Sequence, residues 1–491
     1  MTLVKQNDST FIRLYDDVGY IYNNLTKKDR LYSTEDSLYL AVLSREPRTM
    51  EALLDDLYAR MDSPPHKSIL QAHLEGFVAD LEQDHYLITG DNAEALAASE
   101  PDYEYANDAY HPRVADSHNG GYDDTSDYFF ELFQQKPRIF RANIDITSRC
   151  NERCRHCYLP EGREKADLDT DLVLDVLDQL AELNALSVTF SGGEAFLHRD
   201  LDKMLRRARE NDLSMTVLTN GTHVSDDMVR LLKEVRADEV QLTLFSMDPE
   251  VHDSITRLPG SHKKALDTVE RLIAAEVPLD LSCPVVKANK SCFKDVVLWA
   301  RKRRIKVTTD FVLMACTDFD TANLEDTRLD LGEVEELIRG MFTYDEDYIA
   351  YLNKDELPLD PRTLIGKPVC GAGRDTISLA ADGKYYFCPL YRQELGDVRH
   401  DRIADIWQKN EHVIKLREVT WTDFPKCTSC DAFHFCSMCF ARNYNENDGD
   451  ILDINSFCCE VAFLNKRLVD EYWQQNDQLT YAERFNKVAK G

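Results

Sequence analysis

Three cysteines that follow a strand-like run have the spacing of an iron–sulfur ligand loop. Cys150, Cys154 and Cys157 stand in the order Cys-x-x-x-Cys-x-x-Cys, directly after the apolar run 140–147. Thiolates select iron–sulfur clusters, zinc or Cu(I) over harder metals. A structural zinc site needs four close ligands, and His156 inside the triplet is badly placed to be the fourth. Three thiolates would leave one iron of a [4Fe–4S] cube open to a ligand that is not protein.

The elements that must position this triplet alternate between strands and helices from residue 137 to 345. Strands are expected at 140–147, 186–190, 214–219, 239–245, 279–286 and 305–313. Amphipathic helices are expected at 168–183, 200–210, 225–235, 261–275 and 291–303. Six βα units in a row predict an α/β fold whose parallel sheet curls into a partial (β/α)6 barrel. Chemistry in such barrels lies at the strand C-terminal ends, where the triplet falls.

Small and polar residues follow the next three strands. They are Gly192, Gly193 and Glu194 after the second strand, Asn220 after the third, and Ser246 and Arg257 after the fourth. Two glycines permit close backbone approach, and a carboxylate behind them can hold an ammonium group. Each residue also has an ordinary interpretation as part of a turn, a cap or the surface. Their common place at strand ends favours a site for a small molecule.

A second group of cysteines lies near the C-terminal end of the sequence. Its members are Cys370, Cys388, Cys427, Cys430, Cys436, Cys439 and Cys458, with Cys459 adjacent. The two Cys-x-x-Cys pairs are individually typical of a zinc ribbon, so zinc remains a competing interpretation. Seven cysteines are enough for one metal site with four ligands, and three cysteines would then remain.

Composition limits the classes of function. The chain has 491 residues, enough for two to four domains, and a net charge of −30, which argues against nucleic-acid binding but is compatible with a basic peptide partner. No apolar run approaches a membrane span, and 1–9 is polar. We therefore expect a cytoplasmic protein, in which fourteen cysteines indicate metal or catalysis rather than disulfides.

The sequence divides into six segments. Residues 1–90 are expected to form a compact α+β unit with strands at 11–15, 19–22, 30–33 and 86–89 and helices at 36–44, 50–61 and 69–81. The next five segments are an acidic linker at 91–136, the barrel at 137–345, a bridging segment at 346–365, the cysteine-rich domain at 366–470 and a tail at 471–491.

The triplet, the Gly192-Gly193-Glu194 motif, Asn220 and the six βα units resemble the radical S-adenosylmethionine (SAM) enzymes over residues 138–340. The resemblance implies that SAM chelates the open iron. Glu194 would then hold the SAM ammonium, Asn220 and Ser246 the ribose side, and Arg257 the carboxylate. The backbone around His156 would pack on adenine. Reduction would yield a 5′-deoxyadenosyl radical that abstracts hydrogen from an unactivated C–H bond.

The second cysteine group resembles the SPASM extension of peptide-modifying radical SAM enzymes, which implies two auxiliary [4Fe–4S] clusters and three in total. By position, Cys370, Cys388 and Cys439 would ligate the first auxiliary cluster, and Cys427, Cys430, Cys436 and Cys458 the second, with Cys459 as a spare. Thr376 stands where members with a complete first cluster have Cys. The fourth iron of that cluster would be open, or Asp375 or Asp382 would be its ligand. Pro389 replaces the general-base Asp of sulfatase-maturing members, which excludes formylglycine formation.

The N-terminal unit resembles the PqqD-like, winged-helix-like peptide-recognition element of ribosomal-peptide maturases. In that family a precursor's leader adds a strand to a sheet edge, here beside a groove between 30–33 and 69–81. The resemblance implies a maturase, reduced by flavodoxin or ferredoxin, that installs a Cys sulfur-to-carbon thioether. A substrate thiolate on the open auxiliary iron would favour that bond. Alternatives are a carbon–carbon crosslink (a cyclophane), epimerisation with Cys316 as hydrogen donor, and a non-catalytic zinc and peptide scaffold.

Overall fold

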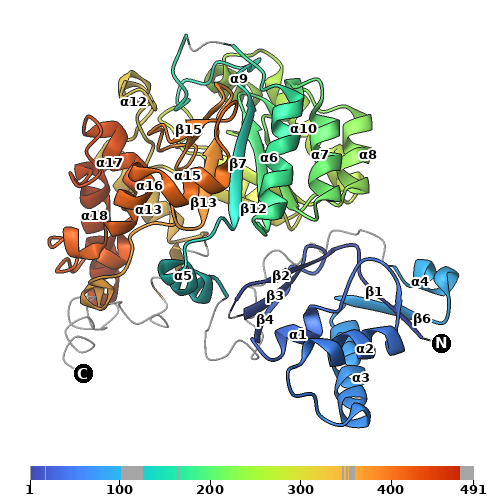
Figure 1. The fold of residues 1–491 in the computed structure, drawn as a ribbon. Helices are drawn as coiled ribbons and strands as arrows, with labels where there is room; N and C mark the ends of the chain where they lie inside the picture. The colour runs from blue at the N-terminus through green and yellow to red at the C-terminus, as the bar shows by residue number, and fades with distance from the viewer. Residues whose placement is uncertain are drawn as a thin grey trace.

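Three connected parts make up the chain in the computed structural model (Figure 1). The structure describes residues 2–16, 18–100, 125–162, 165–345, 348–349, 352 and 360–475. Most of the predicted linker 91–136, the middle of the bridging segment 346–365 and the end of the tail 471–491 therefore lie outside the described residues. Within the described part of the chain, no helix combines the length and apolar character needed to cross a membrane.

A parallel six-stranded sheet with helices between its strands forms the central part. Its strands are β7 (Arg141–Thr147), β8 (Ser187–Gly192), β9 (Ser214–Thr219), β10 (Glu239–Thr243), β11 (Leu279–Pro284) and β12 (Lys306–Asp310). The helices are α6 (Thr170–Glu182), α7 (Leu201–Glu210), α8 (Asp226–Glu234), α10 (Ser261–Ala274) and α11 (Phe293–Arg301). All six predicted strands and five predicted helices are confirmed to within a few residues. The sequence prediction missed α9 (Pro249–Thr256), a short helix after β10.

The sheet does not stop at the six predicted strands. Strand β13 (Thr376–Leu379) pairs in parallel with β7, and β14 (Lys384–Tyr386) and β15 (Gly396–Asp397) continue in antiparallel order. The result is one nine-stranded sheet in the order β12-β11-β10-β9-β8-β7-β13-β14-β15. The cysteine-rich domain is therefore joined to the barrel by backbone pairing, which the sequence did not predict because β13 and β14 are short.

Helices complete the C-terminal part beside this sheet extension. They are α12 (Ala322–Glu325), α13 (Leu331–Met341), α15 (Ile403–Lys409), α16 (Glu411–Glu418), α17 (Phe440–Glu446) and α18 (Ser456–Gln475), with 3-10 turns η2 (Pro361–Leu364), η3 (Trp421–Asp423) and η4 (Phe433–Phe435). A further 3-10 turn, η1 (Ala195–Leu197), follows β8 in the barrel. A capping box of Asp330 and Glu333 starts α13. Helices α17 and α18 lie at the far side of the molecule from α8 (Figure 1).

The N-terminal part contains two small antiparallel sheets rather than one. Strands β2 (Thr10–Leu14), β3 (Val18–Asn23) and β4 (Asp29–Ser33) form the first, and β1 (Leu3–Gln6) pairs with both β5 (Arg48–Thr49) and β6 (Leu87–Gly90) in the second. The helices are α1 (Ser37–Leu40), α2 (Met50–Arg60) and α3 (Lys67–Gln83). Strands β1 and β5 were not predicted, because they are short and only partly apolar.

The groove predicted between residues 30–33 and 69–81 is crossed by contacts within the protein. Arg30 Nη1 lies 2.7 Å from Asp80 Oδ2, and the rings of Tyr32 and Phe77 lie 5.4 Å apart in an edge-to-face arrangement. These contacts join β4 to α3. A peptide bound here would lie over them rather than between the two elements.

The stretch 91–136, predicted to be a solvated linker, has a helix at each end. These helices are α4 (Ala93–Ser99) and α5 (Thr125–Gln135). Phe129 and Phe133 of α5 are buried against Tyr15 and Tyr20 of the first N-terminal sheet, with ring centroids 4.8–6.2 Å apart. The acidic composition of the whole stretch concealed this local aromatic cluster, so the prediction was wrong at both ends.

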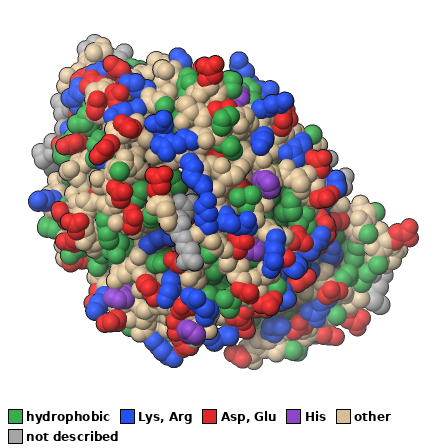
Figure 2. All heavy atoms as spheres, turned by 90° about the horizontal axis from the view of Figure 1, so that it is seen from above, with side chains coloured by type: hydrophobic (Ala, Val, Ile, Leu, Met, Phe, Trp, Pro, Cys, Tyr) green, Lys and Arg blue, Asp and Glu red, His purple; other side chains and the backbone are tan. Residues whose placement is uncertain are grey.

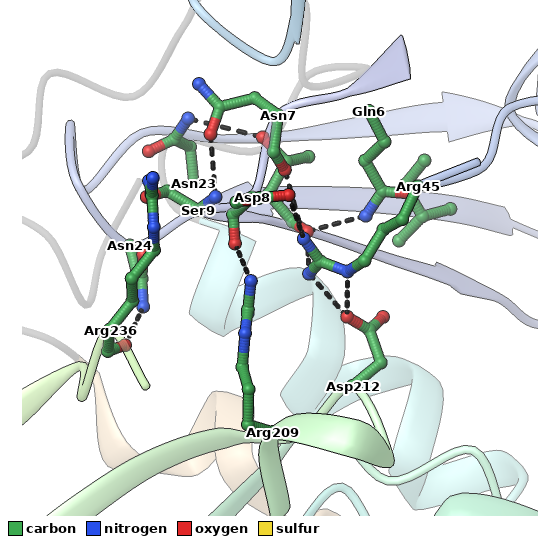
Figure 3. A network of polar contacts seen from close by, with 12 residues as sticks. Gln6, Asn7, Asp8, Ser9, Asn23, Asn24, Arg45, Arg209, Asp212 and Arg236 are labelled. Atoms are coloured by element: carbon green, nitrogen blue, oxygen red, sulfur yellow. Dashed lines mark hydrogen bonds and ion pairs between the residues drawn. The ribbon is translucent and has the colours of Figure 1, made fainter. Parts of the chain in front are cut away.

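Charged and polar groups fix the N-terminal part to one end of the barrel (Figure 3). Asp212, in the loop before β9, accepts from Arg13 Nη1 (3.1 Å) and from Arg45 Nε and Nη2 (2.8 and 2.5 Å). Arg13 is only 5 % exposed and also donates through Nε to the Ala185 carbonyl (2.8 Å). The desolvated guanidinium of Arg13 therefore depends on these partners.

The next loop of the barrel contributes further contacts to the same interface. Asp238, directly before β10, accepts from Tyr22 Oη (2.7 Å) and Lys27 Nζ (2.6 Å). Arg236 Nη1 donates to Ser9 Oγ (2.7 Å), and its carbonyl accepts from Asn24 Nδ2 (2.8 Å). Because these loops precede the strands, the N-terminal part lies at the strand N-terminal ends, opposite the cysteine triplet.

We expect Asp212→Ala to weaken this interface because two guanidinium groups lose a shared carboxylate. The free energy of unfolding should fall by roughly 2–3 kcal/mol, measured by urea denaturation. Asp55→Ala, which removes the partner of Lys67 from an exposed pair, is the matched control and should change stability by less than about 0.5 kcal/mol. Equal losses in both variants would contradict a specific role for Asp212.

Candidate metal and cofactor site

A cavity of about 570 Å³ opens at the C-terminal ends of the barrel strands. All three cysteines of the triplet line it. So do six other residues singled out from the sequence, namely His156, Gly192, Gly193, Asn220, Arg257 and Cys316. The structure therefore brings together residues that are far apart in the chain, but Glu194 and Ser246 are not among the lining residues.

The triplet cysteines are free thiols, each partly buried. Burial raises the pKa of Cys150 to about 11 and the pKa of Cys154 well above its usual value. The Cys154 thiol donates to Glu152 Oε2 (3.3 Å). Among the described residues, no three His, Cys, Asp or Glu side chains converge closely enough to hold a single metal ion.

The two glycines pack the end of β8 directly against the cysteine loop. A Cβ on Gly193 would lie 2.2 Å from the Arg149 carbonyl oxygen and 2.9 Å from Cys150 Cβ. A Cβ on Gly192, whose φ is +129°, would lie 2.1 Å from the Thr147 carbonyl oxygen. The backbone N–H groups of Gly193 and Glu194 donate to those same two carbonyl oxygens. Only glycine permits this approach, which sets the position of Cys150.

Glu194 is buried and is not among the residues that line the cavity. Its carboxylate is 1 % exposed and accepts from Thr219 Oγ1 (2.8 Å), the Asn220 N–H (2.7 Å) and the Phe196 N–H (3.0 Å). Burial raises its pKa, and these three bonds oppose that rise. Glu194 therefore joins η1 to the end of β9, and the structure does not place its carboxylate at the cavity wall.

Asn220 lines the cavity and is held in one orientation. Its Nδ2 donates to Asn151 Oδ1 (2.9 Å), and its Oδ1 accepts from the N–H and Oγ1 of Thr222. Asn151 belongs to the cysteine loop. The bond from Asn220 therefore ties the end of β9 to that loop.

Ser246 is also removed from the cavity wall. Its side chain is fully buried, accepts from the Asp248 N–H (2.9 Å) and lies 3.3 Å from Cys292 Sγ. Thr243 and Phe245, just before it, line the cavity instead. The contact of Ser246 with the ribose side of a bound molecule therefore stays a prediction.

His156 and Arg257 occupy opposite environments at the cavity. The His156 ring lies 5.0 Å from the Phe245 ring, and burial lowers its pKa to about 4, so the imidazole is neutral near pH 7. Its Nδ1 has no hydrogen-bond partner among the described residues. Arg257 ends α9 in the left-handed conformation (φ +54°) and is exposed. Such a neutral ring and an exposed cation suit a bound molecule with an aromatic base and an acid group.

Cations gather at the mouth of the cavity despite the net charge of −30. Exposed Arg153, Arg155 and Lys165 line it together with Arg257. In the view from above, Lys and Arg side chains cluster around the middle of this face (Figure 2). Glu152, Glu161 and Asp320 line the same cavity, so its charged groups are of both signs, with cations in slight excess.

Cys316 and Tyr158 are further sulfur and phenol groups at the cavity. Cys316 Sγ donates to the Cys157 carbonyl oxygen (3.5 Å), so this thiol lies beside the triplet. Burial, with Asp145 nearby, raises the pKa of Tyr158, and Cys157 and Cys388 raise it further. Tyr158 therefore lies between the triplet and the second cysteine group, and its place directly after Cys157 is the sequence signal that was missed.

Cys370, Cys388 and Cys439 form the first of two thiol groups in the C-terminal part. The pKa of Cys388 is raised to about 12, mainly by burial, and the nearby Cys370 and Cys439 thiols contribute to this rise. Asp375 is close enough to raise the pKa of Cys370, whose value burial brings to about 11. Asp382 instead accepts from Tyr386 Oη (2.8 Å) and the Lys384 N–H in the β13–β14 turn.

The remaining thiols form the second group. The pKa of Cys436 is raised to about 12, mainly by burial, and Cys459, Cys458 and Cys427 contribute to this rise. Burial also raises the pKa of Cys427 to about 11, with contributions from Cys459 and Cys430. Cys458 and Cys459 therefore both lie near Cys436, and the ligand sets expected from the sequence stay predictions.

A buried ion pair joins the first thiol group to the barrel. Arg392 Nη2 lies 2.7 Å from Asp145 Oδ2 on β7, and both side chains are largely buried. Arg392 Nε also donates to the carbonyl of Pro389, the residue after Cys388. This pair fixes the Cys388 turn against the barrel interior, and no sequence pattern indicated it.

Two family models match the chain at these sites. A radical SAM superfamily model matches residues 144–300, and a SPASM iron–sulfur cluster-binding domain model matches residues 370–431. The chain therefore contains both domains, which imply [4Fe–4S] clusters and SAM as cofactors. The second match contradicts the zinc interpretation of the C-terminal cysteines.

Relatives of known name cover most of the same region. A PqqA peptide cyclase of Granulibacter bethesdensis is 27 % identical over 303 residues, which are 58 % of this chain and 78 % of the relative. An AdoMet-dependent heme synthase of Nitratidesulfovibrio vulgaris is 20 % identical over 336 residues, 64 % of this chain and 90 % of that one.

Among solved structures, Streptococcus suis SuiB bound to its precursor peptide SuiA superposes with a TM-score of 0.60. The two chains are 13 % identical, and the match covers 93 % of this chain and 99 % of SuiB. At that identity the likeness concerns the fold alone.

We expect Gly193→Ala to disturb the cysteine loop, since the added methyl group would overlap the Arg149 carbonyl. After anaerobic loading with iron and sulfide, the iron content should fall by about four per chain, the content of one cluster. Gly340→Ala is the matched control, because nothing lies within 4 Å of a Cβ there. Full loading of Gly193→Ala would show that the close approach is not required.

Proposed function

We propose that this chain, a radical SAM enzyme with a SPASM iron–sulfur domain, installs an intramolecular crosslink in a ribosomally made precursor peptide. The observation that carries the proposal is one continuous sheet that joins the strand before the cysteine triplet to the strands between Cys370 and Cys388. The names PqqA peptide cyclase and SuiB with its precursor peptide support a peptide substrate.

The donor set at the cavity fits a [4Fe–4S] cluster and SAM. Cys150, Cys154 and Cys157 would ligate three irons, while Asn220 and Arg257 would contact SAM, with His156 beside its adenine. The bound cofactors supply one-electron cleavage of a C–S bond and thereby a radical able to take hydrogen from carbon. We assign Glu194 to positioning Asn220 rather than to the SAM ammonium.

The protein's own groups enclose the cavity and orient the molecules bound in it. Gly192 and Gly193 let the cysteine loop close one side of the cavity, and Phe245 with neutral His156 supplies an apolar wall. Such enclosure limits access of water to reactive intermediates. The Arg392–Asp145 pair holds the first thiol group at a fixed place beside the cavity.

We further propose that the bond formed is a thioether between a substrate Cys sulfur and carbon. Cys370, Cys388 and Cys439 provide three thiolates, and Thr376 provides none in the place of a fourth. An iron open to a substrate thiolate would favour this product. Including the triplet and the second thiol group, the proposal contains three clusters.

A carbon–carbon crosslink is the second candidate, and Asp375 is the observation that favours it. Its carboxylate lies beside Cys370 and accepts from Thr376 Oγ1 (2.6 Å). If Asp375 supplied the fourth ligand, the first auxiliary cluster would have no place for a substrate thiolate. Asp382 is held in its turn and is the weaker candidate ligand. Epimerisation remains a further alternative, with Cys316 beside the triplet as its hydrogen donor.

We propose that the N-terminal part recognises the leader of the precursor. Its β4–α3 side would receive the peptide. The interface with the barrel puts the N-terminal part at the strand N-terminal ends, so the core segment must reach the opposite end of the barrel. Flavodoxin or ferredoxin would be the reductant, and a cytoplasmic location agrees with fourteen cysteines that are all free thiols.

Replacing Cys150, Cys154 and Cys157 together by Ala should abolish cleavage of SAM, because the iron that binds it is lost. The reconstituted variant should keep about eight of about twelve irons. Cys283→Ala, which alters a thiol buried within β11, is the control and should cleave SAM normally. Cleavage by the triple variant would disprove the assignment of the triplet.

The product is tested by anaerobic co-expression with a short Cys-bearing peptide encoded beside this gene, followed by mass spectrometry. A crosslink removes two hydrogens from the peptide, whereas an unchanged mass would argue against crosslinking. Iodoacetamide then distinguishes the bonds, since a thioether sulfur resists alkylation. A crosslinked product whose cysteines all remain alkylatable would overturn the thioether and favour the carbon–carbon bond.

A further inference from the structure

Helix α9, the short helix that the sequence prediction missed, contacts several parts of the cavity wall. Phe245 precedes it in the chain and Arg257 follows it, and both line the cavity. The carbonyls of the last two residues of α9 accept from the backbone N–H groups of Arg153 (2.9 Å) and Arg155 (3.2 Å), which belong to the cysteine loop. The placement of α9 therefore affects the cysteine loop as well as these two side chains.

His252 fixes α9 to the end of β10. Its side chain is buried, and its Nδ1 accepts from the Phe245 N–H (3.2 Å). Burial, with His262 nearby, lowers the pKa of His252 to about 4, so the ring is neutral near pH 7 and carries its proton on Nε2. The ring centroids of His252 and Phe245 lie 5.5 Å apart. His252 therefore holds both the backbone and the ring of Phe245.

Phe245 connects His252 to groups that face the cavity. Its ring lies 5.0 Å from the His156 ring, and Cys154 packs against the apolar cluster to which Phe245 belongs. Its carbonyl accepts from Asn289 Nδ2 (2.8 Å), so side chains hold both the N–H and the carbonyl of this residue. Loss of the His252 bond would free the N–H side of Phe245 and, with it, one wall of the cavity.

The next residue, Asp253, fixes the loop that carries Arg257. Its carboxylate accepts from the Gly260 N–H (2.5 Å), from Ser261 Oγ (2.9 Å) and from the His262 N–H (2.9 Å). These bonds tie α9 to the start of α10 and close the short loop between the two helices. Arg257, in the left-handed conformation, lies inside this closed loop. The carboxylate therefore fixes the point from which the Arg257 side chain extends.

We propose that His252 and Asp253 are positioning residues for bound SAM. His252 acts through Phe245 and the apolar wall, whereas Asp253 acts through Arg257. Neither His252 nor Asp253 is among the residues that line the cavity, so each acts through another residue. The inference rests on the proposed function, which assigns SAM to this cavity.

His252→Leu and His252→Asn provide a matched pair of variants, because only Asn can accept from the Phe245 N–H. In the metal-free full chain, amide hydrogen exchange over 242–247, measured by mass spectrometry, should be faster in His252→Leu and near the parental rate in His252→Asn. After anaerobic loading with iron and sulfide, the dissociation constant of SAM is measured by equilibrium dialysis. It should rise about fivefold to tenfold in His252→Leu and less than about twofold in His252→Asn.

Asp253→Ala should speed exchange over 257–262 in the metal-free chain and raise the SAM dissociation constant by a similar factor. In an Arg257→Ala background the same change should add less than about twofold, because the group that Asp253 positions is already absent. Glu250→Gln, an exposed change on the same helix, is the control and should match the parent in exchange and SAM binding.

Parental exchange and SAM binding in His252→Leu or in Asp253→Ala would overturn the role of that residue. Equal weakening by Leu and Asn at position 252, or additive effects of Asp253→Ala and Arg257→Ala, would also overturn it. If a variant does not fold, His252→Gln, whose amide lies at the place of Nε2, or Asp253→Asn, which loses one acceptor oxygen, replaces it with the same expected direction. A parent protein that binds no SAM would instead contradict the proposed function, which is a separate result.

Discussion

The pairing of β13 with β7 is the constraint on which the rest of this structure depends. Strand β7 leads at its C-terminal end into the cysteine triplet, and β13 lies between the loop of Cys370 and the turn that contains Cys388. Backbone hydrogen bonds between these two strands fix the two sites in one rigid frame. The Arg392–Asp145 ion pair adds a side-chain link across the same junction. The radical chemistry proposed for the triplet and the electron transfer proposed for the first thiol group both depend on a fixed distance between the two sites. A shared sheet provides that distance better than a flexible connection would.

Much of the barrel was predictable, because its sequence pattern is local. Apolar strands and amphipathic helices alternate with little interruption, so the six strands from β7 to β12 were predicted within a few residues. The residues of the cavity followed from their positions after those strands. Gly192 and Gly193 were correctly associated with close backbone approach, and the contacts of a Cβ at either position show why no other residue fits.

The sequence was less informative where tertiary contacts decide the outcome. The three donors that hold the Glu194 carboxylate could not be read from its place in the sequence. The same holds for the contact of Ser246 with Cys292. Strand β13 and the aromatic side of α5 become stable only against partners that are distant in sequence.

The docking of the N-terminal part uses loops that contribute nothing to the cavity. Asp212, Arg236 and Asp238 precede their strands, whereas the lining of the cavity follows the strands. Mutations that change the N-terminal part therefore act on a surface separated from the reactive centre by the full height of the barrel. Under the proposed role of the N-terminal part in binding the leader, peptide recognition and radical chemistry occupy separate surfaces. Replacing the docked part would then change the peptide bound while the radical chemistry stays the same.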